Sequence, residues 1–236
     1  MTRPALFFDF FGTLVDYIPH NEDRDYPLTM ALLRSQGIRV EQQAFLDLLK
    51  DTFIAHEQKA IIDDREYAWE DCAFEALRKL TGQSASWATA DALTETYLKE
   101  WCEDVSPIAG VAEMLARLQE HHALCLITNT HSTRMVHDLL SEFGLYGLFH
   151  NRIISSVEYG YRKPSARIFA HAMARTKATP DNSIYIGDTY EADYVGAKGA
   201  GMGMLLIDPD GKHDIGDDER LGSILDLEKA LERFAI

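Results

Sequence analysis

The sequence predicts an α/β protein with a doubly wound parallel sheet and an all-helical insertion after its first strand. Three observations predict this fold. After residue 107, short apolar runs alternate with helical patterns, which is typical of a parallel sheet with helices on both faces. Between residues 27 and 102, apolar residues recur at three- and four-residue intervals, and no strand pattern is found. One short apolar strand, Leu6–Phe10, precedes that block and is expected to join the later sheet.

The insertion is expected to consist of helices. Gly37 and Gly82 follow two of the helical patterns, and glycine is common just beyond a helix end. The patterns cover residues 28–37, 41–62, 68–82 and 88–101. We therefore predict a helical domain of residues 18–103, inserted into a core domain of residues 1–17 and 104–236.

The core alternates helix and strand up to the C-terminus. The acidic stretch 208–219 has no apolar pattern, so we expect a solvated loop there. The expected helices are 110–121, 132–144, 165–177, 191–201 and 225–234, and the expected strands are 123–128, 152–156, 183–188 and 204–208.

Composition and charge narrow the classes of partner. The formal net charge of −15 repels nucleic-acid phosphates and anionic lipid, but local groups in a cleft can still bind a small anionic substrate. No apolar run approaches the length of a membrane span, and the N-terminus has no signal-type segment. The three cysteines have no metal-type spacing, and Cys125 lies in an apolar run. We expect a cytoplasmic protein, a monomer or homodimer, with no nucleic-acid or membrane partner.

Polar residues follow the predicted strands at their carboxyl ends. In an open parallel sheet, ligands bind just outside these ends. Each residue alone is a common strand-ending or helix-capping type, but together they offer carboxylates, a hydroxyl and an ammonium group. They are Asp9 after the first strand, Thr128 and Asn129 after the strand at 123–128, Lys163 shortly after 152–156, and Asp188 after 183–188.

Four short motifs at these strand ends resemble those of the haloacid dehalogenase (HAD) superfamily. They are DFFGT at 9–13, LIT at 126–128, RKP at 162–164 and GDTYEAD at 187–193. The resemblance implies a Rossmann-like hydrolase core with a helical cap inserted after the first strand. It also implies that Asp9 is the nucleophile, which forms a covalent aspartyl intermediate.

The resemblance implies further roles for residues of these motifs. Thr128 and the backbone N–H of Asn129 would bind an oxygen of the substrate. Lys163 would neutralise both the acidic cluster and the substrate anion. A magnesium ion would be held by Asp9, the backbone carbonyl of Phe11, Asp188 and Asp193, and such oxygen ligands suit Mg²⁺.

Phe11 departs from the phosphatase pattern of the superfamily. Phosphatases carry aspartate there, as the general acid for the leaving oxygen and later the base for water, and such a group contributes about 10²–10⁴-fold. Phenylalanine can do neither. Tyr17 and His20 are the candidate substitutes in the following loop. A branch that cleaves phosphonates uses a cap lysine, for which Lys50 is the candidate here.

The 2-haloacid dehalogenases of the superfamily have an aromatic residue at the position of Phe11, because a halide leaves without a proton. They use no metal, however, and carry a serine-type residue where this chain has Asp188. Since Asp188, Asp193 and Lys163 suit a cation and an oxyanion, the sequence favours Mg²⁺-dependent hydrolysis of a small phosphorylated metabolite. Metal-independent carbon–halogen hydrolysis is the alternative. A further alternative is a catalytically impaired member that binds a ligand or a protein.

Overall fold

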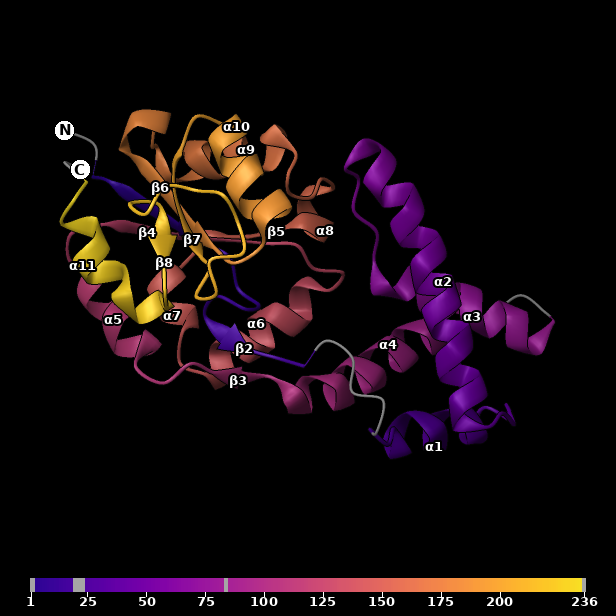
Figure 1. Ribbon diagram of the computed structural model, residues 1–236. Coiled ribbons are helices and arrows are strands. Elements are labelled where there is room, and N and C mark those ends of the chain that lie inside the picture. Colours follow the sequence, from indigo (N-terminus) through magenta and orange to yellow (C-terminus); the bar gives the residue numbers. More distant parts are fainter. Residues whose placement is uncertain (1–2, 19–23, 83–84, 235–236) are drawn as a thin grey trace. The chain divides into compact units, whose positions relative to one another are not determined.

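The computed structural model describes residues 3–18, 24–82 and 85–234. The chain divides into two compact units, one of Met1–Tyr17 with Ser106–Ile236 and one of Ile18–Val105 (Figure 1). The first unit contains the large sheet, and the second contains helices α1 to α4. Within the described residues, no helix combines the length and apolar character needed to cross a bilayer.

The predicted α/β fold is confirmed. Six parallel strands form one sheet in the order β5-β4-β1-β6-β7-β8, so the first strand of the chain lies between two later ones. Phe8 of β1 is level with Leu126 of β4 and with Ile186 of β6. The strands are β1 (Ala5–Phe8), β4 (Ala123–Thr128), β5 (Ile153–Ser155), β6 (Ser183–Gly187), β7 (Gly203–Ile207) and β8 (Arg220–Leu221).

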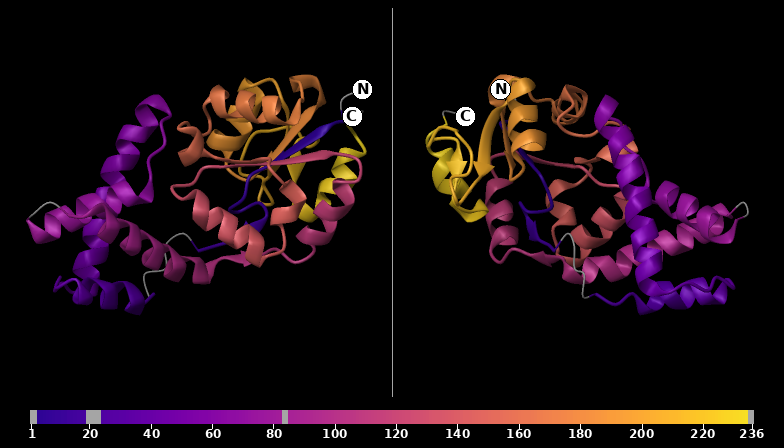
Figure 2. Two further views of the ribbon diagram at one scale, coloured as in Figure 1. Left: turned by 180° about the vertical axis from the view of Figure 1, so that it is seen from behind. Right: turned by 45° about the vertical axis from the view of Figure 1, so that its right-hand side comes forward.

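Helices cover both faces of this sheet because successive apolar side chains of the strands point to opposite faces. Phe7 belongs to a buried cluster with Phe169 of α9, whereas the ring of Phe8 contacts Phe149 of α7, with 6.1 Å between centroids. Figures 1 and 2 show α9 and α10 on one side of the sheet, and α5 and α11 on the other. The helices are α5 (Val111–Leu118), α6 (Thr133–Glu142), α7 (Tyr146–Phe149), α8 (Ser156–Tyr159), α9 (Ala166–Thr176), α10 (Gly196–Gly199) and α11 (Leu227–Leu231).

Several elements differ from the sequence prediction. A two-stranded antiparallel ribbon, β2 (Val15–Asp16) with β3 (Ser106–Pro107), had no recognisable pattern. The helix expected over 191–201 is a π-helical turn, η3 (Tyr190–Val195), followed by the short α10. The helix expected over 225–234 is shorter and follows the 3₁₀ turn η4 (Ile224–Asp226).

The acidic stretch is not solvated throughout. Asp208 is buried, accepts hydrogen bonds from the N–H groups of Lys212 and His213, and pairs with Arg220 of β8. These bonds compensate the carboxylate for the water it loses on burial. Elsewhere in the core, a further 3₁₀ turn, η2 (Pro180–Asn182), precedes β6. The three cysteines of the chain are free thiols.

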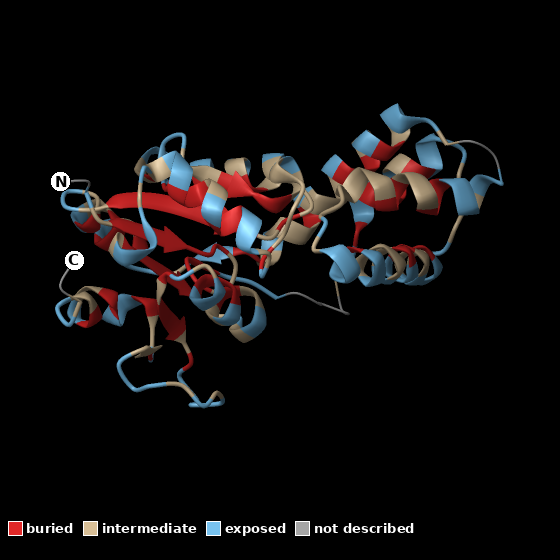
Figure 3. Cartoon of the chain, turned by 90° about the horizontal axis from the view of Figure 1, so that it is seen from above, coloured by how far each residue is buried: buried red, intermediate tan, exposed pale blue. Residues whose placement is uncertain are grey.

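The second unit has an apolar core of its own. Leu33, Phe45, Leu77 and Leu93, one from each helix, are buried together, and Figure 3 shows such buried positions in red beside pale-blue exposed ones. Glu100 is buried and accepts hydrogen bonds from the first N–H groups of α1, which satisfies donors that a helix start leaves unpaired. The helices are α1 (Pro27–Ser35), α2 (Gln42–Asp63), α3 (Trp69–Thr81) and α4 (Trp87–Trp101), followed by the 3₁₀ turn η1 (Cys102–Asp104).

Candidate active site

The structure brings Asp9, Asp188 and Asp193 together at the carboxyl edge of the sheet. Asp9 directly follows β1, and its N–H donates to the carbonyl of Ile186 on β6 at 2.9 Å. Asp188 directly follows β6, and η3 carries Asp193 back over the end of the same strand. One carboxylate oxygen from each of the three lies within 4.8 Å of the others. Parallel neighbouring strands therefore gather these acids, although 184 positions separate the first from the last.

Lys163 pairs with two of the three carboxylates of the acidic cluster. Its side chain is only 2% exposed, and Nζ lies 2.8 Å from Oδ1 of Asp9 and 2.6 Å from Oδ1 of Asp193. The third donor of the ammonium reaches the hydroxyl of Tyr185 at 2.8 Å. Lys163 is therefore a buried lysine and not one on the protein surface.

Asn129 holds the backbone of the loop that carries Lys163. Its Nδ2 donates to the carbonyl of Lys163 at 3.0 Å, and its Oδ1 accepts from the N–H of Lys163 at 2.8 Å. This reciprocal pair fixes the lysine backbone from the end of β4, so that Nζ can reach the carboxylates. The predicted role of the Asn129 N–H in substrate binding is separate from this side-chain contact and stays a prediction.

Thr128 is the last residue of β4, next to β1 in the sheet. The register places it one residue beyond the position level with Asp9. It is fully buried, and its Oγ1 lies 3.5 Å from the carbonyl of Asn129, at the limit of hydrogen-bond distance. The structure thus places Thr128 at the right edge of the sheet, and its predicted contact with a substrate oxygen stays a prediction.

Two hydroxyl groups that sequence reasoning missed complete the cluster. The hydroxyl of Tyr185, in the middle of β6, lies 2.9 Å from Oδ1 of Asp193 and 3.2 Å from the carbonyl of Ile127. Thr13 is buried and donates from Oγ1 to Oδ1 of Asp188 at 3.1 Å. Tyr185 could have been noticed as the one side chain with a polar tip inside the apolar run IYIG.

Two glycines allow the carboxylates to approach the backbone. Gly12 has φ +78°, and a Cβ there would lie 2.5 Å from Oδ2 of Asp188. A Cβ at Gly187 would lie 2.5 Å from Oδ2 of Asp193. Both distances are far below normal van der Waals contact, so the positions of these two acids depend on glycine at 12 and 187.

The cluster holds more negative charge than its single ammonium can balance. Burial raises the pKa of Asp9 to about 7, and the carboxylates of Asp193 and Asp188 add to this rise against the opposing effect of Lys163. Burial, together with Asp193, also raises the pKa of Asp188 to about 6, although the hydrogen bond from Thr13 opposes it. Burial alone would lower the pKa of Lys163, but Asp193 and Asp9 outweigh it and raise that pKa. Additional positive charge at the cluster would favour the ionised form of Asp9 that a nucleophile needs at neutral pH.

These residues fit a magnesium ion. Three carboxylates against one ammonium leave two negative charges, which one divalent cation would balance. Their oxygen atoms are the hard ligands that Mg²⁺ prefers, and the ion commonly takes only a few carboxylates. The cluster has the donor type, the charge and the spacing that such a site needs.

Phe11 lies two residues after Asp9, and its aromatic ring packs against two other rings. The ring is half-buried and makes edge contacts with the rings of Phe10 and Tyr17, at centroid distances of 4.9 and 5.3 Å. Burial and the charges of Asp188 and Asp9 raise the pKa of Tyr17 above its usual value. Tyr17 is therefore a weaker acid than a free tyrosine. The other candidate substitute, His20, lies outside the described residues.

Comparison with known proteins identifies a family and several relatives for this chain. The sequence model of the haloacid dehalogenase-like hydrolases matches residues 4–201. A ribulose-1,5-bisphosphate 5-phosphatase of Halopiger xanaduensis is 29% identical over 123 residues, which are 52% of this chain and 51% of that protein. A phosphoglycolate phosphatase of Mesorhizobium japonicum is 24% identical over 213 residues, or 88% and 84% of the two chains. The chain thus spans about half the length of the first of these relatives.

Solved structures show the same fold. A 2-haloacid dehalogenase from Pseudomonas syringae superposes with a TM-score of 0.74 at 23% identity, and the match covers all of both chains. A putative HAD-hydrolase from Bacillus subtilis, bound to magnesium, gives a TM-score of 0.63 at 20% identity, with coverage of 98% and 100%. At these identities the likeness concerns the fold alone.

Proposed function

Because the chain belongs to the haloacid dehalogenase-like hydrolases, we propose that it hydrolyses a small phosphorylated compound, with Asp9 as covalent nucleophile and Mg²⁺ as cofactor. The observation that carries this proposal is the cluster of three carboxylates around one buried ammonium. A site with this charge favours a cation and a substrate oxyanion together. The phosphatases among the relatives support the same class of substrate.

The proposed reaction has two steps. A carboxylate oxygen of Asp9 attacks phosphorus, the bond from phosphorus to the ester oxygen breaks, and an aspartyl phosphate forms while the leaving group departs as its oxyanion. Water then attacks the aspartyl phosphate, which releases inorganic phosphate and restores Asp9. When bound, the metal ion would be held by Asp9, the Phe11 carbonyl, Asp188 and Asp193, and would stabilise negative charge on the phosphoryl oxygens.

Residues around Asp9 position and neutralise the reacting groups. Lys163 donates to Asp9 and so directs the nucleophile, and its charge offsets that of the phosphoryl group. Thr128 and the N–H of Asn129 would take a phosphoryl oxygen at the end of β4. The helical unit Ile18–Val105 would act as the cap and supply the contacts that select the substrate.

Phe11 restricts which esters such a site can cleave. Phe11 has no proton to give to the leaving oxygen, and the raised pKa of Tyr17 makes its hydroxyl a weaker proton donor than a free tyrosine. The best substrates should then be those whose leaving group departs as a stable anion. p-Nitrophenyl phosphate is such a compound and can serve as the first probe.

A direct assay tests the proposal. The full chain should hydrolyse p-nitrophenyl phosphate with Mg²⁺, lose this activity with excess chelator and regain it on readdition of Mg²⁺. Asp9→Asn should abolish turnover, because the amide cannot attack phosphorus. Turnover that survives both chelation and Asp9→Asn would contradict the proposed chemistry.

The aromatic residue at position 11 favours one alternative, carbon–halogen hydrolysis. In that reaction Asp9 would displace halide from carbon, and water would then cleave the resulting ester. The measurement is halide release from 2-chloropropionate in the presence of chelator, where Asp9→Asn should again be inactive. Release in chelator, without phosphate ester hydrolysis in Mg²⁺, would replace the phosphatase proposal. No turnover of either compound would favour a binding role for the same site.

A further inference from the structure

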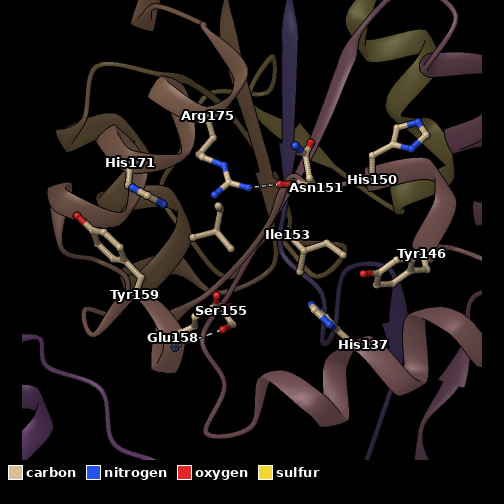
Figure 4. Close-up of a pocket in the computed structure, with 11 residues that line it drawn as sticks. His137, Tyr146, His150, Asn151, Ile153, Ser155, Glu158, Tyr159, His171 and Arg175 are labelled. Carbon is tan, nitrogen blue, oxygen red and sulfur yellow. Dashed lines mark hydrogen bonds between the residues drawn. The ribbon is translucent and has the colours of Figure 1, made fainter.

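A hollow lies on the core beside the edge strand β5, and none of the charged residues of the acidic cluster line it. Its volume is about 410 Å³, within the range of pockets for small molecules. Figure 4 shows side chains from α8 and α9 on one side of the strand and from α6 and α7 on the other. The aromatic and basic residues that line it are His137, Tyr146, His150, Tyr159, His171 and Arg175.

The charge of this hollow departs from that of the whole protein. The chain carries a net charge of −15, yet Arg175 and three histidines line the hollow with one carboxylate, Glu158. The guanidinium of Arg175 donates to the backbone carbonyl of Asn151, and no carboxylate of the described residues forms an ion pair with it. Since guanidinium has five N–H donors, others remain for a ligand. Arg175 therefore offers a permanent positive charge to an anionic group.

His171 adds a hydrogen-bonding group to the hollow but little positive charge at neutral pH. Burial and the nearby charge of Arg175 lower the pKa of His171, while Glu158 opposes this shift. When His171 is neutral, the guanidinium of Arg175 is the main positive charge on this side of the hollow. A ligand with one small anionic group would match this single charge.

Aromatic rings form flat surfaces on both sides of the strand. The rings of Tyr159 and His171 stack at 4.5 Å between centroids with 25° between their planes. The rings of His137 and Tyr146 meet edge to face at 5.3 Å. Rings paired in this way are held in place and present broad surfaces on which a planar group can pack.

The rim of the hollow also carries a strained residue. His150 has φ +51° and ψ −123°, a backbone conformation that residues other than glycine rarely adopt. Strain of this kind is commonly found at ligand-binding sites, where the surrounding structure holds a side chain in a required place. At the end of α7, this strain places an imidazole at the hollow (Figure 4).

We propose that the hollow beside β5 binds a small organic anion in which a phosphate or carboxylate group is joined to a planar ring. Arg175 binds the anionic group, and the paired aromatic side chains pack against the ring. This site is separate from the site around Asp9, so it does not depend on the proposed phosphatase activity.

Calorimetric titration of the full chain carrying Asp9→Asn tests the proposal without turnover. The probes are AMP and 4-hydroxybenzoate, which distinguish a phosphate from a carboxylate ligand, with adenosine and 4-hydroxybenzyl alcohol as uncharged counterparts. At least one anion should bind, its uncharged counterpart should bind at least tenfold more weakly, and Arg175→Gln should weaken the anion at least tenfold. Failure of both anions to bind would overturn the proposal.

Arg167→Gln is the matched control, because Arg167 lies on the same helix, with its guanidinium over the Tyr161 ring rather than in the hollow. It should change the affinity less than twofold. Equal weakening by both substitutions, or none by Arg175→Gln, would place the anion elsewhere and refute the site. In the chain with native Asp9, Arg175→Gln should leave hydrolysis of p-nitrophenyl phosphate unchanged. If Arg175→Gln does not fold, His171→Ala serves instead, with at least threefold weaker binding expected and unchanged affinity counting against the site.

Discussion

The hydroxyl of Tyr185 is expected to position Lys163 for its role at Asp9, and Tyr185→Phe removes that one group. The hydroxyl accepts from Lys163 at 2.8 Å and lies 2.9 Å from Asp193 in a fully buried setting. After the change, Lys163 still contacts Asp9 and Asp193, and Asp193 still accepts from the N–H of Thr189 at 3.0 Å. The fold should therefore survive, with the ammonium group of Lys163 held less firmly in place.

The cost of losing this hydroxyl follows from its partners. A hydrogen bond to a charged group contributes about 1.5–3 kcal/mol, and the lower end applies because both charged partners keep other contacts. For a chain of this size, each kcal/mol lowers the melting temperature by about 2–4 °C, so a fall of about 3–6 °C is expected. If the same free energy were lost from the transition state, kcat would fall about tenfold, since 1.36 kcal/mol is a factor of ten in rate.

Thermal unfolding and steady-state hydrolysis of p-nitrophenyl phosphate measure the two effects. For Tyr185→Phe, we expect kcat to fall up to about tenfold while KM changes less than twofold, because the hydroxyl acts through Lys163 rather than on the substrate. Tyr67→Phe is the control, since it removes a partly buried hydroxyl that donates to Glu57 in the helical unit. A lower melting temperature with unchanged kcat would show that Tyr185 supports the fold only. No change in either quantity would refute the argument from geometry.

Three further predictions concern the same cluster. Gly12→Ala should lower kcat at least tenfold, because the new Cβ would displace Asp188. Gly144→Ala is the control: Gly144 has a similar φ of +70° but no atom within 4 Å of the added Cβ, so it should cost only about 1–2 kcal/mol of stability. Equal kcat values for the two variants would contradict this prediction. Folded Asp9, with its pKa raised from 3.8 to about 7, holds a proton between those pH values that the unfolded chain has released, so metal-free stability should fall as pH rises through that window. Mg²⁺ should then raise the melting temperature more at pH 8 than at pH 5, and an equal rise in scanning calorimetry would refute the charge argument. Phe11→Asp should raise kcat for alkyl phosphates at least tenfold relative to p-nitrophenyl phosphate, and an unchanged ratio in phosphate-release assays would exclude a proton-donor role at position 11.

The sequence predicted the sheet and the edge at which polar residues gather, because apolar runs mark buried strands and parallel strands share one edge. The α/β fold and membership of the hydrolase family are confirmed. Roles for Asp9 and Lys163 came from motif resemblance and remain proposals, but their 2.8 Å contact is a feature of the fold. The spacing of residues in the sequence could not predict this contact, because it depends on how Asn129 holds the loop that carries Lys163.

Other features left no trace in local pattern. Tyr185 is an ordinary strand residue by propensity, and only the tertiary structure sets its hydroxyl between Lys163 and Asp193. Strands of two residues, such as Val15–Asp16 and Arg220–Leu221, are too short to show an alternating pattern. The π-helical turn at Tyr190–Val195 had the same apolar spacing as a short helix, and what distinguishes it is that Asp193 must reach back to Lys163.

The surroundings of Phe11 connect the electrostatics of the cluster to the choice of leaving group. An acid at position 11 would add a fourth carboxylate beside a cluster in which burial already raises the pKa of Asp9 to about 7. An aromatic ring there adds no charge, and it makes an edge contact with the ring of Tyr17. Burial and the charges of Asp188 and Asp9 raise the pKa of Tyr17, which makes its hydroxyl a weaker acid than that of a free tyrosine. With no carboxylic acid at position 11, such a site would favour esters whose leaving group is stable as an anion.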